Sequence, residues 1–359
     1  MKIEKREENL IEELSQLYKK RGYKLYKPSS FEEYSLYQEN KNFLINKNVI
    51  TFSDLGGKLM AMRPDVTLSL IRHNDVKSGY VEKYFYNEMV YRQATGGSDF
   101  KEIRQIGVEV IGEIDSAVIS EVAILICRTL AAVSDEYVLD ISHMGFTEGL
   151  LNEFKSNSAI ISDYIKKKNP HDFYKLAKTE GYSEKLIKAF ELAATCNGSA
   201  KEVLTEAKKV VLNDGMRLAA EELEKLCDTL EQFGFGDKIK INFSASANAD
   251  YYNGVIFNGY LKGIPHSVLS GGRYDKLLKK LGKRGGAIGF ATYIGEIERY
   301  LAKDDDGVDY LILYDALSQY KALRLAQLKI DDGKSVRLAS KIPAGYQYKE
   351  IVDLTEKEN

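Results

Sequence analysis

The sequence predicts an α+β fold, in which an antiparallel sheet is flanked by helices. Strand-like segments come in pairs joined by polar loops, which is typical of antiparallel hairpins. One long stretch between strand-like segments, at about 145–235, has helical spacing throughout. In addition, the strands outnumber those that a doubly wound parallel sheet would contain.

The N-terminal part is predicted to contain a helix, a short strand and a hairpin. Apolar residues recur at helical spacing over 3–20, and Gly22 ends that helix. A short strand is expected over 23–29. Two β-forming runs within 49–62 flank the turn sequence Asp-Leu-Gly-Gly, which predicts a hairpin, and a helix is expected over 66–73.

A second hairpin and a capped helix come next. The hairpin strands, 83–92 and 102–112, are separated by a polar loop that is long for a plain hairpin. A helix is predicted over 117–132, with Asp115 or Ser116 as its N-cap. These elements extend the antiparallel sheet and add a helix to pack against it.

The middle of the chain completes a large domain, which we expect to span 1–303. A strand over 136–142 precedes the helical stretch, which we interpret as an insertion at about 145–235. A last helix is expected to end near 302. Strand-like segments return before it, at 238–243, 251–260 and 267–270.

The C-terminal piece, 304–359, is predicted to be a small domain of element order β-α-β-β. An Asp-rich linker at its start separates it from the large domain. A piece of this size cannot bury enough apolar surface to be stable alone. We therefore expect it to pack against the large domain or against a partner.

Composition argues against several classes of protein. The chain has 359 residues, is 44% hydrophobic and 29% charged, and carries a net charge of −2, so no strong positive field favours nucleic acid. The N-terminus lacks the apolar core of a signal peptide. No stretch approaches the ~20 apolar residues of a membrane span. We therefore expect a soluble, cytoplasmic protein.

Neither a bound metal nor a cofactor is expected. The three cysteines, Cys127, Cys196 and Cys227, match no metal signature and are expected to be free thiols in a reducing compartment. The histidines show no ligand spacing either; they are His73, His143, His171 and His266.

Candidate functional residues gather in polar segments on elements that should be apolar on at least one face. These segments are 63–67, 90–93, 102–109 and the pair 250–254 with 271–275. On the third segment Gln105, Gly107 and Glu109 share one face, because side chains alternate along a strand. A glutamine and a glutamate with a glycine between them predict a hollow with polar walls.

Taken in this order, the segments resemble histidyl-tRNA synthetase, a class II synthetase, over roughly residues 5–302. The family's Arg-Pro-Glu-Gly-Thr motif is similar to 63–67, its Glu-Phe-x-Gln-x-Gly-Val-Glu stretch to 102–109, and its Asp-Tyr-Tyr-x-Gly stretch to 250–254. Gly-Gly-Arg-Tyr-Asp is present without change at 271–275. The resemblance implies the class II fold, with a helical insertion and a C-terminal remnant of an anticodon-binding-like domain.

The resemblance also implies a pocket for histidine. Free histidine presents an ammonium, a carboxylate and an imidazole, and each ring nitrogen needs a partner. By resemblance, Asp65, Thr67 and Gln105 accept from the ammonium, while Glu109 and Tyr252 bind the imidazole. The implied histidine-binding set is completed by Arg92, Tyr251 and Arg273.

The groups that synthetases use for adenylation are largely replaced. Adenylation builds negative charge on a phosphate and requires fixed positive groups, which the family supplies as three arginines. Arg92 matches one, Ala247 and Glu296 stand at the other two places, and Arg299 lies three residues beyond. The loop with Ala94 and a Gly-Gly-Ser run lacks the family's glutamate and basic residues. We therefore predict no adenylation and no catalytic residues.

A histidine pocket without these arginines, followed by about half of an anticodon domain, resembles the regulatory subunits of ATP phosphoribosyltransferase. That resemblance implies a non-catalytic subunit of histidine biosynthesis, which a short catalytic subunit requires for activity. It implies feedback inhibition with histidine as the effector, and a homodimer within a hetero-oligomer. Neither tRNA nor a membrane is an expected partner.

Three other interpretations stay open. The first is an atypical histidyl-tRNA synthetase, which histidine-dependent ATP–pyrophosphate exchange would establish. The second is a paralogue that ligates an amino acid to another acceptor, and the replacements at Ala247 and Glu296 count against its ATP chemistry. The third is a scaffold without a ligand, which an absence of histidine binding in calorimetry would favour.

Overall fold

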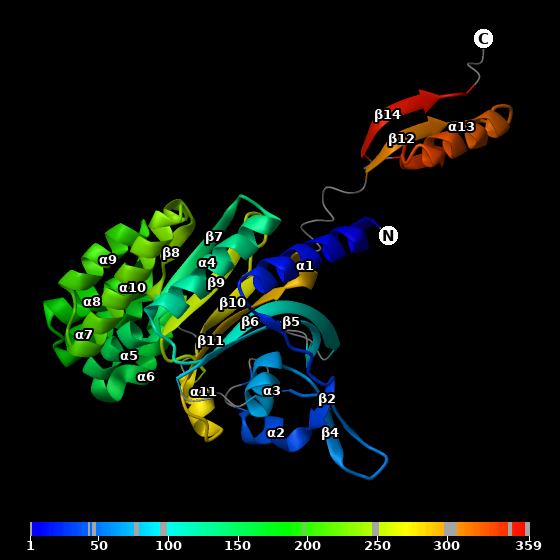
Figure 1. The fold of residues 1–359 in the computed structure, drawn as a ribbon. Helices are drawn as coiled ribbons and strands as arrows, with labels where there is room; N and C mark the ends of the chain where they lie inside the picture. Colours follow the sequence, from blue (N-terminus) through cyan, green and yellow to red (C-terminus); the bar gives the residue numbers. More distant parts are fainter. Residues whose placement is uncertain are drawn as a thin grey trace. The chain divides into compact units, whose positions relative to one another are not determined.

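The computed structural model describes most of the chain, namely residues 2–41, 44, 48–74, 79–93, 99–196, 198–245, 251–297, 307–343 and 347–355. The chain forms two compact units, one over Asn9–Gly295 and one made of Met1–Glu8 together with Glu296–Asn359. The larger unit holds a sheet of eight strands and a smaller sheet of three, with helices packed against them (Figure 1).

The large sheet has the strand order β1-β5-β6-β11-β10-β9-β7-β8. Its inner pairs, from β5 across to β7, are antiparallel as predicted. The long hairpin of β5 and β6 forms one side of the inner sheet. The strands are β1 (Lys24–Leu25), β5 (Val81–Gln93), β6 (Phe100–Gly112), β7 (Tyr137–His143), β8 (Ile239–Ile241), β9 (Val255–Leu261), β10 (Leu269–Arg273) and β11 (Gly286–Tyr293).

The two outer pairs of this sheet add parallel neighbours to the antiparallel core. Strand β1 pairs with β5, and β7 pairs with β8, in parallel. Parallel neighbours need a long crossover connection. Between β7 and β8 that connection is the helical stretch, so the segment predicted as an insertion joins two neighbouring strands at the sheet edge.

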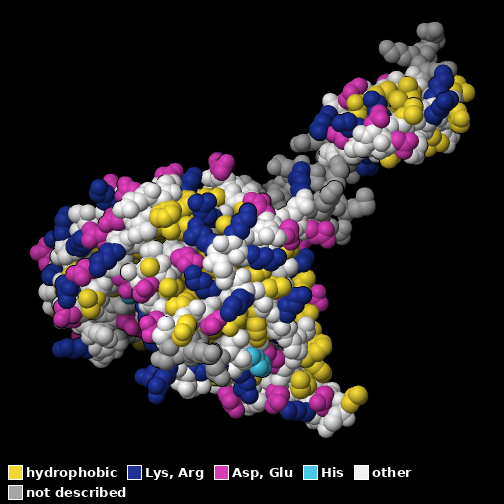
Figure 2. All heavy atoms as spheres, in the orientation of Figure 1, with side chains coloured by type: hydrophobic (Ala, Val, Ile, Leu, Met, Phe, Trp, Pro, Cys, Tyr) yellow, Lys and Arg dark blue, Asp and Glu magenta, His cyan; other side chains and the backbone are white. Residues whose placement is uncertain are grey.

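The helical stretch consists of helices whose exposed faces are rich in charge. They are α5 (Met144–Glu153), α6 (Ser158–Lys166), α7 (Pro170–Glu180), α8 (Glu184–Thr195), α9 (Ala200–Lys209) and α10 (Asp214–Gln232). Exposed ion pairs join neighbouring turns and helices, such as Lys188 with Glu184 and Lys208 with Glu224. In Figure 2 basic and acidic side chains are interspersed over this segment rather than sorted by sign.

Helix α4 (Ser116–Val133) is the core helix of the large sheet. By length and composition alone it could cross a membrane, which corrects the expectation that no stretch approaches such a span. In the fold it packs against β7, β9, β11 and α10, and most of its large apolar residues are buried. Its N-cap is Asp115, whose carboxylate accepts a hydrogen bond of 2.9 Å from the Val118 N–H.

The small sheet contains the predicted hairpin and one further strand. Strands β3 (Thr51–Ser53) and β4 (Leu59–Met62) are antiparallel, so the hairpin prediction is confirmed. Strand β2 (Phe31–Glu33) pairs with the other edge of β4 and leads into helix α2 (Tyr34–Glu39). A strand of three residues is too short for a period-two pattern, so the sequence did not predict it.

The described part of the C-terminal piece has the predicted β-α-β-β order. Its parallel sheet has the strand order β13-β12-β14, and helix α13 packs on one face through Ala322 and Ala326. The outer side of α13 leaves Tyr320 and Leu323 exposed. The elements are β12 (Gly307–Leu313), α13 (Gln319–Asp331), β13 (Val336–Ala339) and β14 (Gln347–Asp353).

Candidate functional site

A small polar pocket lies in the larger unit, between the middle of the sheet and helix α3 (Val66–His73). Its walls come from β5, β6, β10 and β11, from α3 with its cap residue, and from side chains at 251, 252 and 274. The space inside it that is open to the centres of water molecules is about 30 Å³, enough for one or two ordered waters.

Seven of the eight predicted histidine-binding residues line this pocket, although they come from distant parts of the chain. They are Asp65, Thr67, Arg92, Gln105, Glu109, Tyr251 and Tyr252. The eighth, Arg273, does not line it. Of the matched motif positions, Asp250 lies outside the described residues.

The start of α3 places Asp65 and Thr67 at the pocket. Asp65 is the N-cap, and its carboxylate accepts a hydrogen bond of 2.9 Å from the Leu68 N–H. A capping aspartate satisfies one of the free N–H groups at a helix start. Thr67 is the second helical residue, and its hydroxyl donates to Glu109 Oε1. The cap and the first turn therefore bring two polar side chains to the wall of the pocket.

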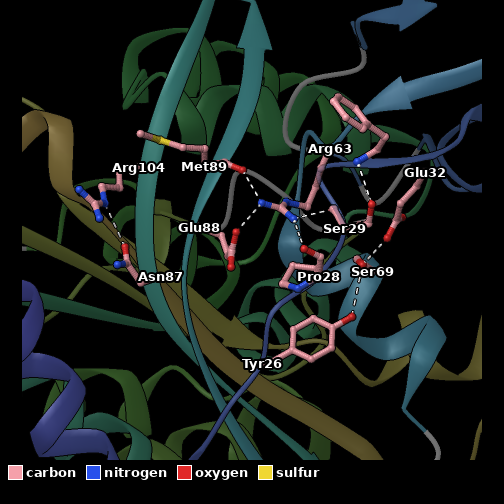
Figure 3. A network of polar contacts seen from close by, with 11 residues as sticks. Tyr26, Pro28, Ser29, Glu32, Arg63, Ser69, Asn87, Glu88, Met89 and Arg104 are labelled. Atoms are coloured by element: carbon pink, nitrogen blue, oxygen red, sulfur yellow. Dashed lines mark hydrogen bonds and ion pairs between the residues drawn. The ribbon is translucent and has the colours of Figure 1, made fainter.

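Arg63 fixes the turn that leads into this helix (Figure 3). Its fully buried guanidinium donates from Nη1 to the carbonyl oxygens of Pro28 at 3.1 Å and Ser29 at 2.6 Å. From Nη2 it donates to Glu88 Oε2 at 2.9 Å and to the Met89 carbonyl oxygen at 2.8 Å. One side chain thus ties segment 28–29 to strand β5 and holds the backbone two residues before the helix cap.

A second arginine supports the same turn from strand β5. Arg92 donates from Nε to the Pro64 carbonyl oxygen at 2.8 Å. Its Nη2 lies 3.6 Å from Asp65 Oδ2, and both side chains are about nine-tenths buried. Burial raises the pKa of the Asp65 carboxyl, and the Arg92 charge opposes that shift. Arg92 is the one basic side chain among the described residues that line the pocket.

Strand β6 presents Gln105 and Glu109 on the pocket face, as the period-two pattern predicts. Gly107 between them is required, because a Cβ there would lie 2.3 Å from the Phe290 carbonyl oxygen and 2.6 Å from the Tyr86 hydroxyl. The Tyr86 hydroxyl therefore occupies the space that the missing side chain of Gly107 leaves free. The predicted hollow is narrower than expected for this reason. Gln105 is 2% exposed, and its Nε2 has no hydrogen-bond partner among the described residues.

Glu109 is a buried carboxylate that no basic side chain among the described residues contacts. Its Oε1 accepts from the Thr67 hydroxyl and its Oε2 from the Tyr274 hydroxyl. Burial raises the pKa of this carboxyl to about 8; the nearby Asp65 charge adds to the shift, and the two hydrogen bonds oppose it. A ligand group with an N–H could donate a further hydrogen bond to this carboxylate.

Two tyrosines close the pocket beside β9. The rings of Tyr251 and Tyr252 meet edge to face with centroids 4.7 Å apart. Burial raises the pKa of both hydroxyls well above the usual tyrosine range, so both stay neutral. They can donate or accept a hydrogen bond but cannot supply charge.

Arg273 was predicted to bind histidine, but it does not line the pocket. It is the last residue of β10, and its Nε donates to Asp275 Oδ2 at 2.9 Å instead of reaching the pocket. Tyr274, the next residue, lines the pocket in its place. The sequence identified the right segment, but Arg273 pairs with Ile288 of β11 and lies on the opposite face of β10 from Ser270, which lines the pocket.

The other lining residues were not among the predicted histidine-binding residues, although Gly271 and Tyr274 lie in the candidate segment 271–275. Tyr86 lies opposite Gly107 in the β5–β6 register, and Tyr293 pairs with Gln105 across β6 and β11. Only the strand pairing reveals these neighbours, because β6 and β11 are far apart in sequence. The set comprises Tyr86, Ser270, Gly271, Tyr274, Gly289, Phe290, Ala291 and Tyr293.

Comparison with known proteins assigns the family. A family model described as histidyl-tRNA synthetase matches residues 2–297. The ATP phosphoribosyltransferase regulatory subunit of Caldanaerobacter subterraneus subsp. tengcongensis is 30% identical over 310 residues, which cover 83% of this chain and 79% of the relative. The chain belongs to the histidyl-tRNA synthetase-like family of ATP phosphoribosyltransferase regulatory subunits.

Solved structures agree on the fold of this family. One is an ATP phosphoribosyltransferase regulatory subunit/histidyl-tRNA synthetase from Bacillus halodurans, with a TM-score of 0.73, 23% identity, and coverage of 98% of this chain and 94% of that one. A chain of the ATP phosphoribosyl transferase (HisG:HisZ) complex from Thermotoga maritima gives 0.65 at 19% identity, covering 80% and 97%. The chain therefore has the class II synthetase-like fold predicted from its motifs.

Several positions at which this chain departs from the synthetase motifs lie outside the described residues. They are Ala94, Ala247 and Arg299, together with the Gly-Gly-Ser run. Glu296 follows the end of β11 by three residues. Within the part of the chain that the structure describes, no cluster of His, Cys, Asp and Glu side chains could hold a metal ion.

Proposed function

We propose that this chain is the non-catalytic regulatory subunit of ATP phosphoribosyltransferase, the first enzyme of histidine biosynthesis. Its partner is the short catalytic subunit, which requires it for activity, and free histidine is the feedback effector. The observation that carries the proposal is the buried pocket with two carboxylates and a single arginine. The names of the relatives and the likeness to a chain of the Thermotoga maritima complex support the choice of enzyme.

The polar groups of the pocket suit a zwitterion that also carries a donating ring. Asp65 and Thr67 offer acceptors for an ammonium, and Glu109 offers one for a ring N–H. Gln105 Nε2 and Arg92 offer donors for a carboxylate. Histidine carries all three groups. We assign its binding to Asp65, Thr67, Arg92, Gln105, Glu109, Tyr251 and Tyr252.

The shortage of positive charge argues for a sensor instead of an activating enzyme. Phosphoryl chemistry requires several fixed cations around the phosphate. Arg92 is already engaged with Pro64 and Asp65, and the sequence has Ala247 and Glu296 at the two other arginine places. A pocket that binds histidine without consuming it can report the histidine concentration, provided that the ligand binds two states unequally.

The remaining assignments concern assembly and location. We propose a cytoplasmic homodimer within a hetero-oligomer, with a large domain over 1–303, a small anticodon-binding-like domain over 304–359, and no tRNA as a partner. The exposed apolar residues on α13, such as Tyr320 and Leu323, are expected to be covered in the assembly.

The experiment is reconstitution with the catalytic subunit. A short ATP phosphoribosyltransferase chain from the same organism should co-purify with this one and become active only in its presence. Histidine should inhibit the complex, and Glu109→Ala should relieve the inhibition while leaving the complex intact. Failure to co-purify or to activate would overturn the regulatory assignment, and inhibition that Glu109→Ala does not change would overturn the pocket assignment.

A second candidate, an atypical histidyl-tRNA synthetase, is favoured by the family model and by the retained Arg92. Histidine-dependent ATP–pyrophosphate exchange by the purified chain, abolished by Arg92→Ala, would establish it. Exchange at the background level in both proteins would favour the regulatory assignment.

A further inference from the structure

Tyr274 stands out among the pocket residues because it contacts the carboxylate assigned to the ligand's ring. Its hydroxyl donates to Glu109 Oε2, and its side chain is 2% exposed. Its backbone N–H donates to the Ala287 carbonyl oxygen at 2.8 Å, and its ring packs on Tyr251 with centroids 5.5 Å apart. The hydroxyl is thus held in place from both the main chain and the ring.

The contacts of the Glu109 carboxylate restrict its movement toward other hydrogen-bond partners. It lies against Gly289 of the neighbouring strand, where a Cβ would fall 2.0 Å from Oε2, so only glycine leaves room for it. On its other side Oε1 accepts from the Thr67 hydroxyl. Glu109 is therefore fixed by one backbone surface and two hydroxyl donors.

Those two hydroxyls are what stabilises a charge on Glu109. The other titratable groups that line the pocket are Asp65, Arg92, Tyr86, Tyr251, Tyr252 and Tyr293. Asp65 disfavours a second negative charge nearby, and Arg92 is directed to Asp65. A hydrogen bond donated to a buried carboxylate favours its charged form. Removing either donor should therefore make the charged form harder to reach.

We propose that Tyr274 is a positioning residue, which holds Glu109 as a charged acceptor and thereby sets the pH range over which the pocket binds a ligand with a ring N–H. The identity of that ligand as histidine rests on the proposed function. The effect on Glu109 itself does not, because it belongs to the unliganded protein. Burial raises the pKa of Glu109 to about 8, so its protonation changes near neutral pH, where a lost donor has a visible effect.

Tyr37 provides a matched control. It is another fully buried tyrosine, and its hydroxyl donates to a different buried carboxylate, Glu32 Oε2, at 3.0 Å. Tyr274→Phe and Tyr37→Phe each delete one hydroxyl from a buried tyrosine–carboxylate pair. A general loss of packing or stability would affect both variants, whereas the proposed role concerns Tyr274 alone.

The test follows the Glu109 carboxyl by carbon-13 NMR of the full chain labelled at glutamate, with the signal assigned by its loss in Glu109→Gln. Tyr274→Phe should move the titration midpoint to higher pH, and Tyr37→Phe should leave it at the wild-type value. In calorimetry with L-histidine at pH 7, Tyr274→Phe should bind about tenfold more weakly, as the loss of one hydrogen bond to a charged group implies. That deficit should shrink as the pH rises past the midpoint.

An unchanged Glu109 titration in Tyr274→Phe would overturn the inference, as would an equal shift in Tyr37→Phe. If the wild-type chain binds no histidine but the midpoint still moves in Tyr274→Phe alone, the role of Tyr274 stands and the histidine assignment fails. The two proposals are therefore tested separately.

Discussion

Arg63 and Glu109 are two buried ionisable side chains at opposite ends of segment 63–67. Arg63 belongs to the segment, Glu109 contacts Thr67 at its other end, and the partners of the two side chains differ. The Arg63 guanidinium donates through its two terminal nitrogens to three carbonyl oxygens and the Glu88 carboxylate, and only its Nε has no partner among the described residues. Glu109 meets two hydroxyls and no described cation, and the Gln105 amide in the same pocket has no partner among the described residues. A buried charge that the fold satisfies serves the structure, whereas one left short of partners is available for a ligand.

The largest expected effect is a loss of stability on removal of the Arg63 guanidinium. Arg63→Met removes a buried cation and leaves Glu88 and three carbonyl oxygens without their donor, which should cost about 3–5 kcal/mol of the free energy of unfolding. Urea denaturation followed by circular dichroism measures it. Lys24→Met, which breaks the exposed pair with Glu82, is the control and should change stability very little. Similar losses in both variants would remove the distinction between the two regions.

Substitution of Glu109 is expected to raise the free energy of unfolding, whereas substitution of Arg63 lowers it. Its folded pKa of about 8 lies above the ordinary glutamate value of 4.5, so the folded chain holds an extra proton between those values and loses stability as the pH rises through that window. Glu109→Gln removes this loss, and relative to wild type it should gain stability on the order of 4 kcal/mol from pH 5 to pH 9. Thermal melts at the two pH values measure the difference. If the stability advantage of Glu109→Gln over wild type shrank with rising pH, Glu109 could not be a buried carboxyl without a basic partner.

Ligand binding should separate Glu109 from Asp65. Glu109→Ala should weaken histidine binding by about 2 kcal/mol, or roughly thirtyfold, because the imidazole distinguishes histidine from other amino acids. Asp65→Ala should weaken it less, since the Thr67 hydroxyl and the side-chain oxygen of Gln105 still offer acceptors for the ammonium. Isothermal titration of both variants measures the two affinities. Wild-type affinity in Glu109→Ala would refute the pocket assignment.

The smallest effect is expected at Tyr252. Tyr252→Phe keeps the ring contact with Tyr251 and removes one neutral hydrogen bond, which should cost about 1 kcal/mol of binding free energy. The same titration measures it, with Glu109→Ala alongside. A loss larger than that of Glu109→Ala would mean that the hydroxyl, and not the carboxylate, carries the recognition of the ring.

The sequence predicted most of the strands and seven of the pocket-lining residues because their patterns are local. Alternation places Gln105 and Glu109 on one face of β6 wherever that strand lies. Likewise, the cap at Asp115 is a local hydrogen bond between neighbours in sequence. These features are decided within a few residues, and the structure has them where the sequence placed them.

The rest of the site depends on contacts between strands that are distant in sequence. Nothing near Tyr86 indicates that its ring faces Gly107, and nothing near Gly289 indicates that Glu109 lies against it. Arg273 lies off the pocket wall because its register with Ile288 places it on the opposite face of β10 from Ser270. Strand pairing and register, which the sequence pattern does not fix, therefore decide the remaining half of the pocket wall.

A crystal of the chain soaked with both ATP and L-histidine tests the central claim most directly. We predict unreacted histidine in the pocket between the sheet and the start of helix α3, with a ring nitrogen at hydrogen-bond distance from Glu109. Density for a histidyl-adenylate in that pocket would contradict the claim, and so would histidine bound elsewhere with Glu109 still closed off by Thr67 and Tyr274.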